Sequence, residues 1–550
     1  MTQALPPADP HPAEETALDD PGLPFRQSAL DILLRRMRSE SDFPALSEAI
    51  GAINRIAASD REGVNELSNN ILKDFALTNK LLRLANVAFY NQVGGGSIST
   101  ISRAVVILGF DAVRSIALSL ILFDNLENKA HAQQLKEEFV KLLYAGMLAR
   151  EMAGKAQVAD VEEAFIGAML HKLGRMLAMF YFPAETAQIE ERIAAEGLGD
   201  SRVSSEVLGV SFENLGIGIA RSWGFPDQLV QSMKKLPEGK LRRSTAGADR
   251  LRALAGFSNA LCEAILDTPD SERGKALAKI TGRFSDVVPI GVEQLAEVME
   301  KSMHDFAQFA LAVNVNLKQS DFAQQASKWA GVRMPAASTD PSASADDRAA
   351  LESTMLHEHA PILDDASAAV PESAPRSSAE IQAALSSGLQ DVGNSLIDDN
   401  VSINDILRMI LEAMYTGMGF DHVVLCIKDG RRNAMCGKFG FGDGVQDLIR
   451  AFDFPLTAPA DVFLVALQQN ADILITDIDD AKIATRIPAW YRARVAAHTF
   501  ALFPIIVRGK AVGLIYADRA RPGDITIPEK ELSLLKSLRN QAVLAIRQSV

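Results

Sequence analysis

The stretch Ala164-Phe165-Ile166-Gly167-Ala168-Met169-Leu170-His171-Lys172-Leu173-Gly174 decides how the first half of this 550-residue chain folds. With the residues that follow it, up to Phe182, it comes closest to the run of about 18 apolar residues that a membrane-spanning helix needs. His171, Lys172 and Arg175 interrupt that run. We therefore predict a buried helix within a bundle and expect no membrane partner.

Amphipathic segments extend from this stretch in both directions and predict an all-helical block. Apolar residues recur every three or four positions, which is typical of helices with one buried face. Asp42-Phe43-Pro44 provides start signals for an early helix, because Asp suits an N-cap and Pro suits the first turn. Further helices are predicted over Val113–Phe123, Phe139–Met152, Val161–Phe180, Ala187–Ala195, Glu206–Trp223, Gln228–Lys235, Ala246–Leu266, Gly274–Arg283 and Val292–Trp329.

Two biased segments divide the chain into parts. Residues 1–24 hold six prolines and five acidic residues with no Lys or Arg, which predicts a disordered acidic tail. Residues 333–380 hold 25 Ala, Ser or Pro among 48 residues, which predicts a flexible acidic linker. The helical domain, with a C-terminal helical extension, is thus expected over 25–332, and a second domain over 381–550.

Most of the formal net charge of −14 lies in those two segments, with −5 on the tail and −6 on the linker. The charge therefore excludes little about what the folded surfaces bind. We expect the linker to keep the domains at a high effective concentration without fixing their relative geometry. The one basic run, Lys234–Arg243, contains Pro and Gly and is interpreted as a solvated loop, so no nucleic-acid partner is expected.

Cysteine content and the N-terminus indicate the compartment. Three cysteines in 550 residues are typical of a reducing environment. No basic residue precedes Arg26 and no apolar core segment follows, so no secretory signal is visible. We expect a cytoplasmic protein.

Residues 381–550 alternate between helical and strand patterns. Glycines in Lys428–Arg431 and Arg508–Lys510 mark two hairpin turns. The predicted helices are Ile381–Leu396, Ile403–Met418 and Pro528–Gln548, and the predicted strands are His422–Ile427, Ala434–Phe439, Ala451–Leu456, Ile473–Ile475, Thr499–Val507 and Ala511–Asp518. These elements predict an α+β domain with an antiparallel sheet and flanking helices, so the chain is multidomain.

Several ordered segments of the first block resemble the HDOD domain, an all-helical bacterial relative of the HD phosphohydrolases. They are Phe43-Pro44-Ala45-Leu46, Ile71–Thr78, Leu81–Asn86, Ile98–Val105 with Leu108-Gly109-Phe110, Ala164–Gly174 and Arg221–Pro226. The resemblance covers roughly residues 30–240. It implies a regulatory or output module of a bacterial signal-transduction protein.

The resemblance also identifies where a metal site would lie. HD phosphohydrolases hold divalent metals with converging His and Asp side chains, which clamp a phosphate and activate water. His171 is present here, but Lys172 stands where the superfamily has Asp, and Phe212 stands where many relatives carry His. Lys234 and Lys235 occupy the place of a frequent His pair. An ammonium repels a metal ion, so we expect a degenerate metal site, no metal and no enzyme activity, with His171 a packed helix residue.

The second block resembles a GAF domain. The resemblance rests on Phe420–Leu425, the hairpin after it, and Leu502–Asp518. It implies an antiparallel sheet with a small-molecule pocket on one face, covered by Phe454–Asp480 and Arg486–Arg494, and a homodimer through the flanking helices. The candidate pocket residues are Cys426, Cys436, Phe454, Trp490 and Tyr516. A nucleotide or another small molecule is a conceivable ligand, and no other cofactor is expected.

Two alternatives concern the same domain. Cys426 and Cys436 flank the hairpin almost symmetrically, so they could face each other across two strands as a redox pair. Small buried hydrophobes are the commoner role of such cysteines. His422 and His498 are conceivable haem ligands, with structural roles as the simpler interpretation.

These observations favour a non-catalytic regulatory protein in which a GAF sensor controls an HDOD output module and other signalling proteins. A ligand can bias such a pair only through different affinities for two states. A metal-dependent phosphohydrolase or phosphodiesterase that uses His171 with other carboxylates is one alternative. A pure scaffold is another.

Overall fold

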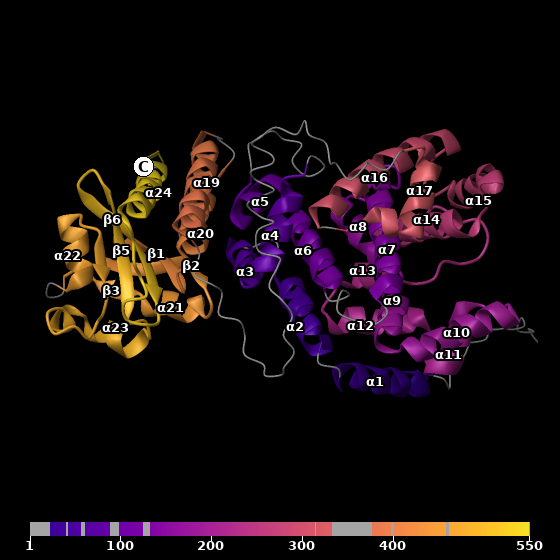
Figure 1. The fold of residues 1–550 in the computed structure, drawn as a ribbon, viewed down its shortest axis with the longest axis horizontal. Coiled ribbons are helices and arrows are strands. Elements are labelled where there is room, and N and C mark those ends of the chain that lie inside the picture. Colours follow the sequence, from indigo (N-terminus) through magenta and orange to yellow (C-terminus); the bar gives the residue numbers. More distant parts are fainter. Residues whose placement is uncertain are drawn as a thin grey trace, which may run out of the picture.

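The computed structural model describes two folded parts that lie side by side (Figure 1). The described residues are 23–39, 42–56, 61–87, 98–124, 132–313, 315–332, 377–397, 401–457 and 461–548. Almost all of the predicted tail (1–24) and linker (333–380) lies outside these ranges. The helix that opens the second part begins at Ser378, within the last three residues assigned to the linker.

The regular elements among the described residues of the first part are all helices, as the sequence predicts. Its helices are α1 Leu23–Ser39, α2 Asp42–Arg55, α3 Arg61–Leu72, α4 Phe75–Ala85, α5 Ile101–Leu108, α6 Phe110–Asp124, α7 Ala132–Met152, α8 Val161–Leu170, α9 Leu173–Tyr181, α10 Pro183–Glu196, α11 Asp200–Leu208, α12 Phe212–Ser222, α13 Asp227–Ser232, α14 Gly247–Asp267, α15 Arg273–Phe284, α16 Val292–Ala312 and α17 Asp321–Ala330, with short 3₁₀ turns η1 Asp270–Glu272 and η2 Leu317–Gln319. Apart from Arg114, Val113–Phe123 is buried, so α6 is a core helix.

Three predicted helices are wrong because each is two helices. Val161–Phe180 breaks at His171, where α8 ends, and α9 starts after Lys172. Glu206–Trp223 breaks at Gly209, whose positive φ of 77° ends α11, and Ser211 then caps α12. Val292–Trp329 breaks between α16 and α17. The first two breaks create the helix ends that line the cavity described below.

The second part is an antiparallel six-stranded sheet with helices on both faces. Strand order is β3-β2-β1-β6-β5-β4. The elements are α19 Ser378–Ile397, α20 Ile403–Met418, β1 His422–Asp429, β2 Ala434–Gly442, α21 Val445–Ala451, β3 Asp453–Pro455, α22 Val462–Gln469, β4 Ile473–Ile475, η3 Ala484–Arg486, α23 Ala489–Arg494, β5 Thr499–Val507, β6 Lys510–Arg519 and α24 Glu529–Gln548. The predicted strand Ala451–Leu456 is shorter than expected because Ala451 ends α21.

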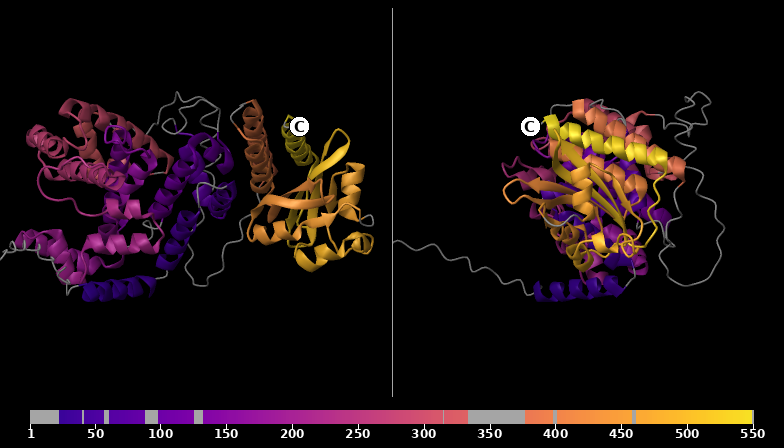
Figure 2. Two further views of the ribbon diagram at one scale, coloured as in Figure 1. Left: turned by 180° about the vertical axis from the view of Figure 1, so that it is seen from behind. Right: turned by 90° about the vertical axis from the view of Figure 1, so that its left-hand side faces the viewer.

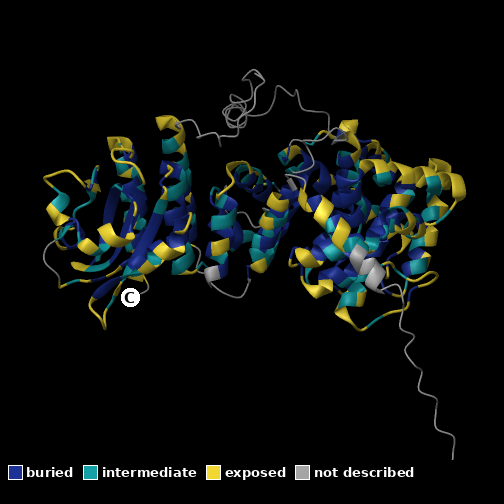
Figure 3. Ribbon diagram, turned by 90° about the horizontal axis from the view of Figure 1, so that it is seen from below, coloured by how far each residue is buried: buried dark blue, intermediate teal, exposed yellow. Residues whose placement is uncertain are grey.

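Alternation along the strands gives the sheet two apolar faces. Leu425 of β1 packs in a core with α19, α20 and α24, whereas Val424 and Cys426 pack on the opposite face with α21, α22 and α23. Successive strand residues point to opposite faces, so each face has its own helical cover. Buried residues accordingly follow the strands in Figure 3.

The two parts are docked on each other, which corrects the expectation of an unfixed geometry. Helices α3 and α5 of the first part lie against α20 and β2 of the second, and the views from the front and from behind agree (Figures 1 and 2). Leu72 and Val106 of the first part pack against the α19/α20/α24 core. Within the described residues, the helices are too short or too polar to span a bilayer.

Candidate functional site

The helical part contains a cavity of about 310 Å³ where the sequence places the degenerate metal site. His171, Lys172 and Phe212 all line it, so the structure brings these three predicted positions together. Lys235 lines the same cavity. The sequence did not identify the carboxylates of this lining, which are Asp200, Glu213 and Glu263.

His171 is held as a neutral, structural side chain. Its Nδ1 lies 3.1 Å from the carbonyl oxygen of Ser232. A carbonyl only accepts, so Nδ1 carries the proton and donates it. Burial, and then the positive charge of Lys172, lower the pKa of His171 to about 4. The ring is therefore uncharged at neutral pH.

The residues of this cavity do not fit a metal ion. Lys172 Nζ pairs with Glu263 at 2.7 Å, and Lys235 Nζ lies 4.0 Å from Asp200. The carboxylates are thus shared with ammonium groups that would repel a cation. Across the described ranges, no three His, Cys, Asp or Glu side chains converge here closely enough to bind one ion.

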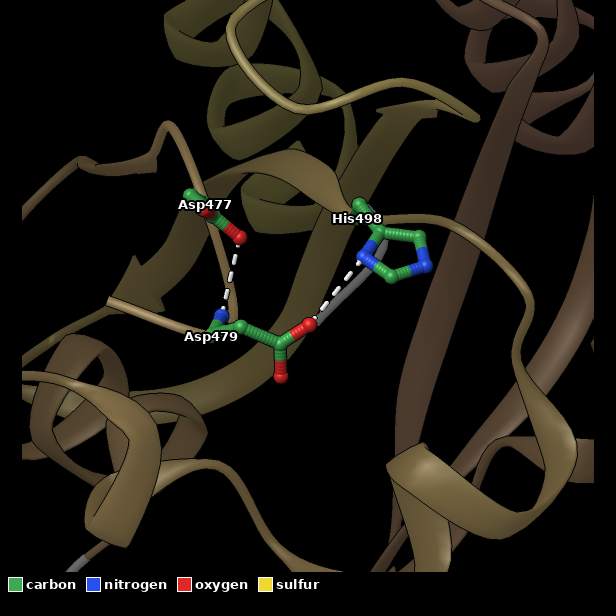
Figure 4. Close-up of side chains that lie close together, drawn as sticks. All are labelled: Asp477, Asp479 and His498. Carbon is green, nitrogen blue, oxygen red and sulfur yellow. Dashed lines mark hydrogen bonds and ion pairs between the residues drawn. The ribbon is translucent and has the colours of Figure 1, made fainter. Parts of the chain in front are cut away.

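The described residues do contain one such convergence, on the C-terminal part: Asp477, Asp479 and His498 (Figure 4). Asp477 Oδ1 accepts a hydrogen bond from the backbone N–H of Asp479 at 2.9 Å. The Asp479 carboxylate pairs with Arg492 at 2.6 Å and lies 3.4 Å from Nδ1 of His498. These carboxylates therefore already have partners in an exposed turn.

The sheet face predicted to hold a small molecule is filled by aromatic rings. Phe454 stacks on Trp490 with centroids 5.2 Å apart, and the Tyr516 ring lies 4.6 Å from that of Phe452. Helices α22 and α23 cover the cluster, as expected for Phe454–Asp480 and Arg486–Arg494. Four of the five candidate pocket residues, all except Cys436, thus belong to one packed core.

The two candidate cysteines do not face each other. Cys426 of β1 pairs with Gly437 of β2, and the neighbouring Ile427 pairs with Cys436. Each cysteine is therefore one position away from the residue opposite the other. Directly paired side chains share a face and neighbours alternate, so the two thiols lie on opposite faces of the sheet. Cys426 is fully buried and burial raises the pKa of its thiol, whereas Cys436 is part-exposed beside Asp453. The symmetric spacing misled because the pair next to the turn is Asp429 with Ala434, so Cys426 lies three positions from that pair and Cys436 only two.

His422, one of the two conceivable haem ligands, uses both of its ring nitrogens in hydrogen bonds. His422 Nδ1 lies 2.8 Å from the Asp518 carboxylate, and Nε2 donates to the Asp443 carbonyl at 2.7 Å. Burial lowers the pKa of His422, but the bond to Asp518 and the charge of Asp518 outweigh it, so the pKa is raised. Neither ring nitrogen is available for a haem iron.

Comparison with known families agrees with this architecture. The family description HDOD domain matches residues 43–236, and the family description GAF domain matches residues 400–547. The chain carries an HDOD domain and a GAF domain. The all-α domain and the α+β domain are therefore confirmed, and the chain is a signalling-associated protein.

Solved structures resemble each half separately. A proposed phosphohydrolase from Shewanella amazonensis SB2B is 23% identical over 52% of this chain and 98% of its own, with a TM-score of 0.40. An HDOD protein of unknown function from Geobacter sulfurreducens is 16% identical over 53% of this chain and 98% of its own, with a TM-score of 0.39. The GAF domain of an Acinetobacter phosphoenolpyruvate-protein phosphotransferase is 16% identical over 32% of this chain and 96% of its own, with a TM-score of 0.26. A comparison with curated proteins finds no significant match.

The GAF domain supplies a carboxylate to the first turn of an HDOD helix. Glu412 of α20 accepts hydrogen bonds from the backbone N–H groups of Ile101 and Ser102, the latter at 2.8 Å. Both groups lie in the first turn of α5, where N–H groups have no partner within the helix and the helix dipole favours an anion. Only 1% of Glu412 is exposed.

A second carboxylate of the GAF domain binds the residues just before that turn. Asp391 of α19 accepts hydrogen bonds from the backbone N–H and the hydroxyl of Ser99, at 2.7 and 2.5 Å. The guanidinium of Arg103 lies 3.5 Å from the same carboxylate and donates to the Asp391 carbonyl. Both charged side chains are almost fully buried. Ser99, Ile101 and Arg103 belong to the segment that carries the HDOD resemblance.

Helix α3 of the HDOD domain covers a free edge of the GAF sheet. β3 pairs with β2 only as far as Cys436, which leaves the outer edge of the end of β2, opposite to β1, without a strand partner. There the Asn69 amide donates to the Gly440 carbonyl and accepts from the Gly442 N–H, each at 3.2 Å. Lys73 also pairs with Asp443 at 3.0 Å. Covering a strand edge in this way satisfies backbone groups that would otherwise invite another chain.

Burial of these carboxylates changes their ionisation. Burial raises the pKa of Glu412 to about 7, against the opposing hydrogen bonds of Ser102 and Ile101. Burial also raises the pKa of Asp391, opposed by Ser99 and Arg103. The sequence analysis missed both residues. No local signal identified Glu412, because the polar residues of α20 (Asn404, Asp405, Arg408, Glu412 and Thr416) recur on one stripe, which predicts a solvated face rather than a buried one.

Proposed function

We propose that this chain is a non-catalytic signalling protein in which the GAF domain controls the HDOD domain by docking on it. The observation that carries the proposal is the buried interface at the start of α5, where Glu412 and Asp391 bind HDOD backbone groups. The interface lies on a segment that identifies the HDOD domain, so docking covers a characteristic surface of the output module.

The balance of charge in the interface favours a reversible contact. Two carboxylates, Asp391 and Glu412, are buried against one guanidinium, Arg103. Burying charge costs several kcal/mol per ion unless partners compensate it, and here backbone N–H groups supply part of that compensation. An interface with such opposing contributions is one that a modest change in the GAF domain can open.

Small-angle X-ray scattering of the full chain tests the proposal. Wild-type protein should scatter as one docked particle, and Glu412→Ala should increase the radius of gyration because two N–H groups of α5 lose their acceptor. Asp447→Ala is the matched control, since Asp447 is an exposed acidic residue of the same domain. Equal radii for wild type and Glu412→Ala would contradict control by docking.

A metal-dependent phosphohydrolase is the second candidate, and one observation favours testing it. The cavity at His171 remains open and carries three carboxylates. The proposal of a non-catalytic domain without metal or other cofactor rests on the pairing of Lys172 with Glu263. Metal analysis of protein purified without chelator, and assays with phosphate esters and cyclic dinucleotides plus divalent metal, decide between the two. Hydrolysis that is lost in His171→Ala would overturn the non-catalytic proposal.

The proposal includes partners and location. Other signalling proteins are the expected targets of the HDOD surface, and a nucleotide or another small molecule is the expected GAF ligand, in a cytoplasmic bacterial setting.

A homodimer through α19 and α24 is supported by exposed Ile397 and Leu544, which are 83% and 48% accessible. Analytical ultracentrifugation of the full chain, with Leu544→Lys as the disrupting variant, tests the dimer. A chain that binds no ligand and keeps its docking unchanged would instead be a scaffold.

A further inference from the structure

The face of the GAF sheet that α19, α20 and α24 cover contains a cavity of about 400 Å³ that the sequence did not predict. It lies between the start of α20, the end of α24 and the β1–β2 hairpin. Its apolar lining consists of Leu407, Leu425, Ile427, Phe439, Val512 and Ile546. This volume is within the range of small-molecule sites, roughly 300–1,000 Å³. The opposite face, by contrast, is filled by its own aromatic rings.

Both register breaks of the sheet fall on residues of this cavity. Leu425 pairs with Phe439 and Cys426 with Gly437, which leaves Lys438 as an extra residue of β2. Ile505 pairs with Gly513 and Ile506 with Ala511, which leaves Val512 as an extra residue of β6. Bulges of this kind redirect side chains and are frequent beside binding sites. Two independent bulges thus open the sheet at one place.

The charged residues of the lining are both lysines. Lys428 and Lys438 line the cavity, and within the described parts of the chain neither ammonium forms an ion pair or a hydrogen bond. The lining contains no carboxylate. An apolar cavity that carries two unneutralised cations is complementary to a ligand with an apolar body and one anionic group.

We infer that this cavity binds a small amphiphilic anion, such as a medium-chain carboxylate, with its chain against Leu407 and Phe439 and its anionic group at Lys428 and Lys438. The site lies on the face of the sheet opposite to the aromatic cluster. It is also next to the interface, because α20 lines the cavity with Leu407 and carries Glu412 five positions later. The proposed site would thus let a ligand act on the helix that docks the HDOD domain, a step that rests on the function proposed above.

Isothermal titration of the full chain with sodium decanoate, below its micellar concentration, tests the site. We expect one decanoate per chain, and about tenfold weaker binding to the Lys428→Ala/Lys438→Ala double variant, since two charge-assisted contacts are lost. Decan-1-ol has the same chain without the charge and should bind wild type and double variant equally. Lys482→Ala, an exposed lysine elsewhere in the domain, should leave decanoate binding unchanged. Val512→Trp should abolish binding of both compounds by filling the cavity.

Three outcomes would overturn the inference. The first is that decanoate does not bind, and the second is that it binds the lysine variant and wild type equally. The third is that two chains dimerise over the cavity, so that Val512→Trp alone is monomeric. The Lys428→Ala/Lys438→Ala variant changes only surface side chains. Its comparison with wild type therefore tests the site even where Val512→Trp does not fold. Hydrogen exchange at Ile101 and Ser102 separates ligand binding from control by docking. If decanoate binds but the exchange rates of these two amides change less than about threefold, the cavity is a binding site and control by docking is contradicted.

Discussion

The HDOD cavity and the interdomain interface both gather charged side chains, but they neutralise them differently. In the cavity, Lys172 pairs with Glu263 inside one domain and both residues are partly exposed. In the interface, Asp391 and Arg103 meet across two domains and only about 2–3% of each side chain is exposed. An ion pair that forms within one domain and in contact with water adds little to the stability of the folded state, so the fold persists when the pair is removed. Charges that are buried only when two domains meet make the contact sensitive to each of them.

Removal of the Asp391 carboxylate should have the largest effect on this contrast. Asp391→Ala leaves the guanidinium of Arg103 without its anion and the Ser99 N–H without an acceptor. Losing one partner of a buried pair costs about 3–5 kcal/mol, so the docked state should become a minor one. Hydrogen exchange at Ser99 and Ile101 measures this. The same substitution in the cavity pair, Glu263→Ala, should cost less than about 1 kcal/mol of stability in denaturant unfolding. Equal costs for the two variants would contradict the comparison.

Acid should strengthen docking. The pKa of Glu412 is about 7 in the docked state and returns toward its ordinary value of 4.5 when the interface opens. The docked state therefore binds more protons between pH 4.5 and 7, so docking gains stability as the pH falls through that window and gains nothing further below it. Asp391, whose pKa is also raised, adds in the same direction. Scattering profiles recorded from pH 8 to 5 test this.

Glu412→Gln provides the control for that pH dependence. The amide does not titrate, so the part of the pH dependence that belongs to residue 412 should disappear, whatever the variant does to the affinity itself. A pH response of unchanged size in Glu412→Gln would assign the effect to another group and contradict the role of Glu412.

The cavity should respond more weakly, through the pKa of His171. Lys172 is the second cause of its low value, after burial. Lys172→Ala should therefore raise the pKa above about 4 while leaving it below the ordinary 6.5, because the ring stays buried. Titration of the His171 ring by NMR measures the shift. Lys234→Ala, outside the cavity lining, should leave it unchanged, and a pKa near 6.5 in Lys172→Ala would show that burial is not the main cause.

Local patterns explain what the sequence could predict. Helical periodicity, hairpin glycines and the order of family segments identify both domains, and β4 and β5 have the predicted bounds. The positions of His171, Lys172 and Phe212 around one cavity were also predictable, because they follow from the family resemblance. Short helices such as α21 to α23 were missed, since six to eight residues give too little periodicity to separate a helix from a strand.

Contacts between distant segments explain what the sequence could not predict. Nothing near Glu412 in the sequence indicates that its partners are Ile101 and Ser102, more than 300 positions away. The bulges at Lys438 and Val512 similarly depend on how strands pair, which composition does not reveal. Turn spacing alone suggested a cysteine pair, but the strand register that starts at Asp429 and Ala434 places the two thiols on opposite faces.

Thiol reactivity tests that register, with the smallest expected effect. Cys262 and Cys426 are buried, and burial raises the pKa of each thiol, whereas Cys436 is partly accessible. A native sample should therefore react with an aromatic disulfide reagent at one thiol per chain, slowly because the pKa of Cys436 is itself raised by burial and by the neighbouring Asp453. Cys436→Ser should abolish the native reaction, while Cys262→Ser should leave it intact. Oxidised glutathione should produce no Cys426–Cys436 disulfide, because closing that bond requires the two side chains to share a face of the sheet. Detection of this disulfide by peptide mapping would mean that β2 pairs with β1 in another register, and the cavity built on the Lys438 bulge would then be lost with it.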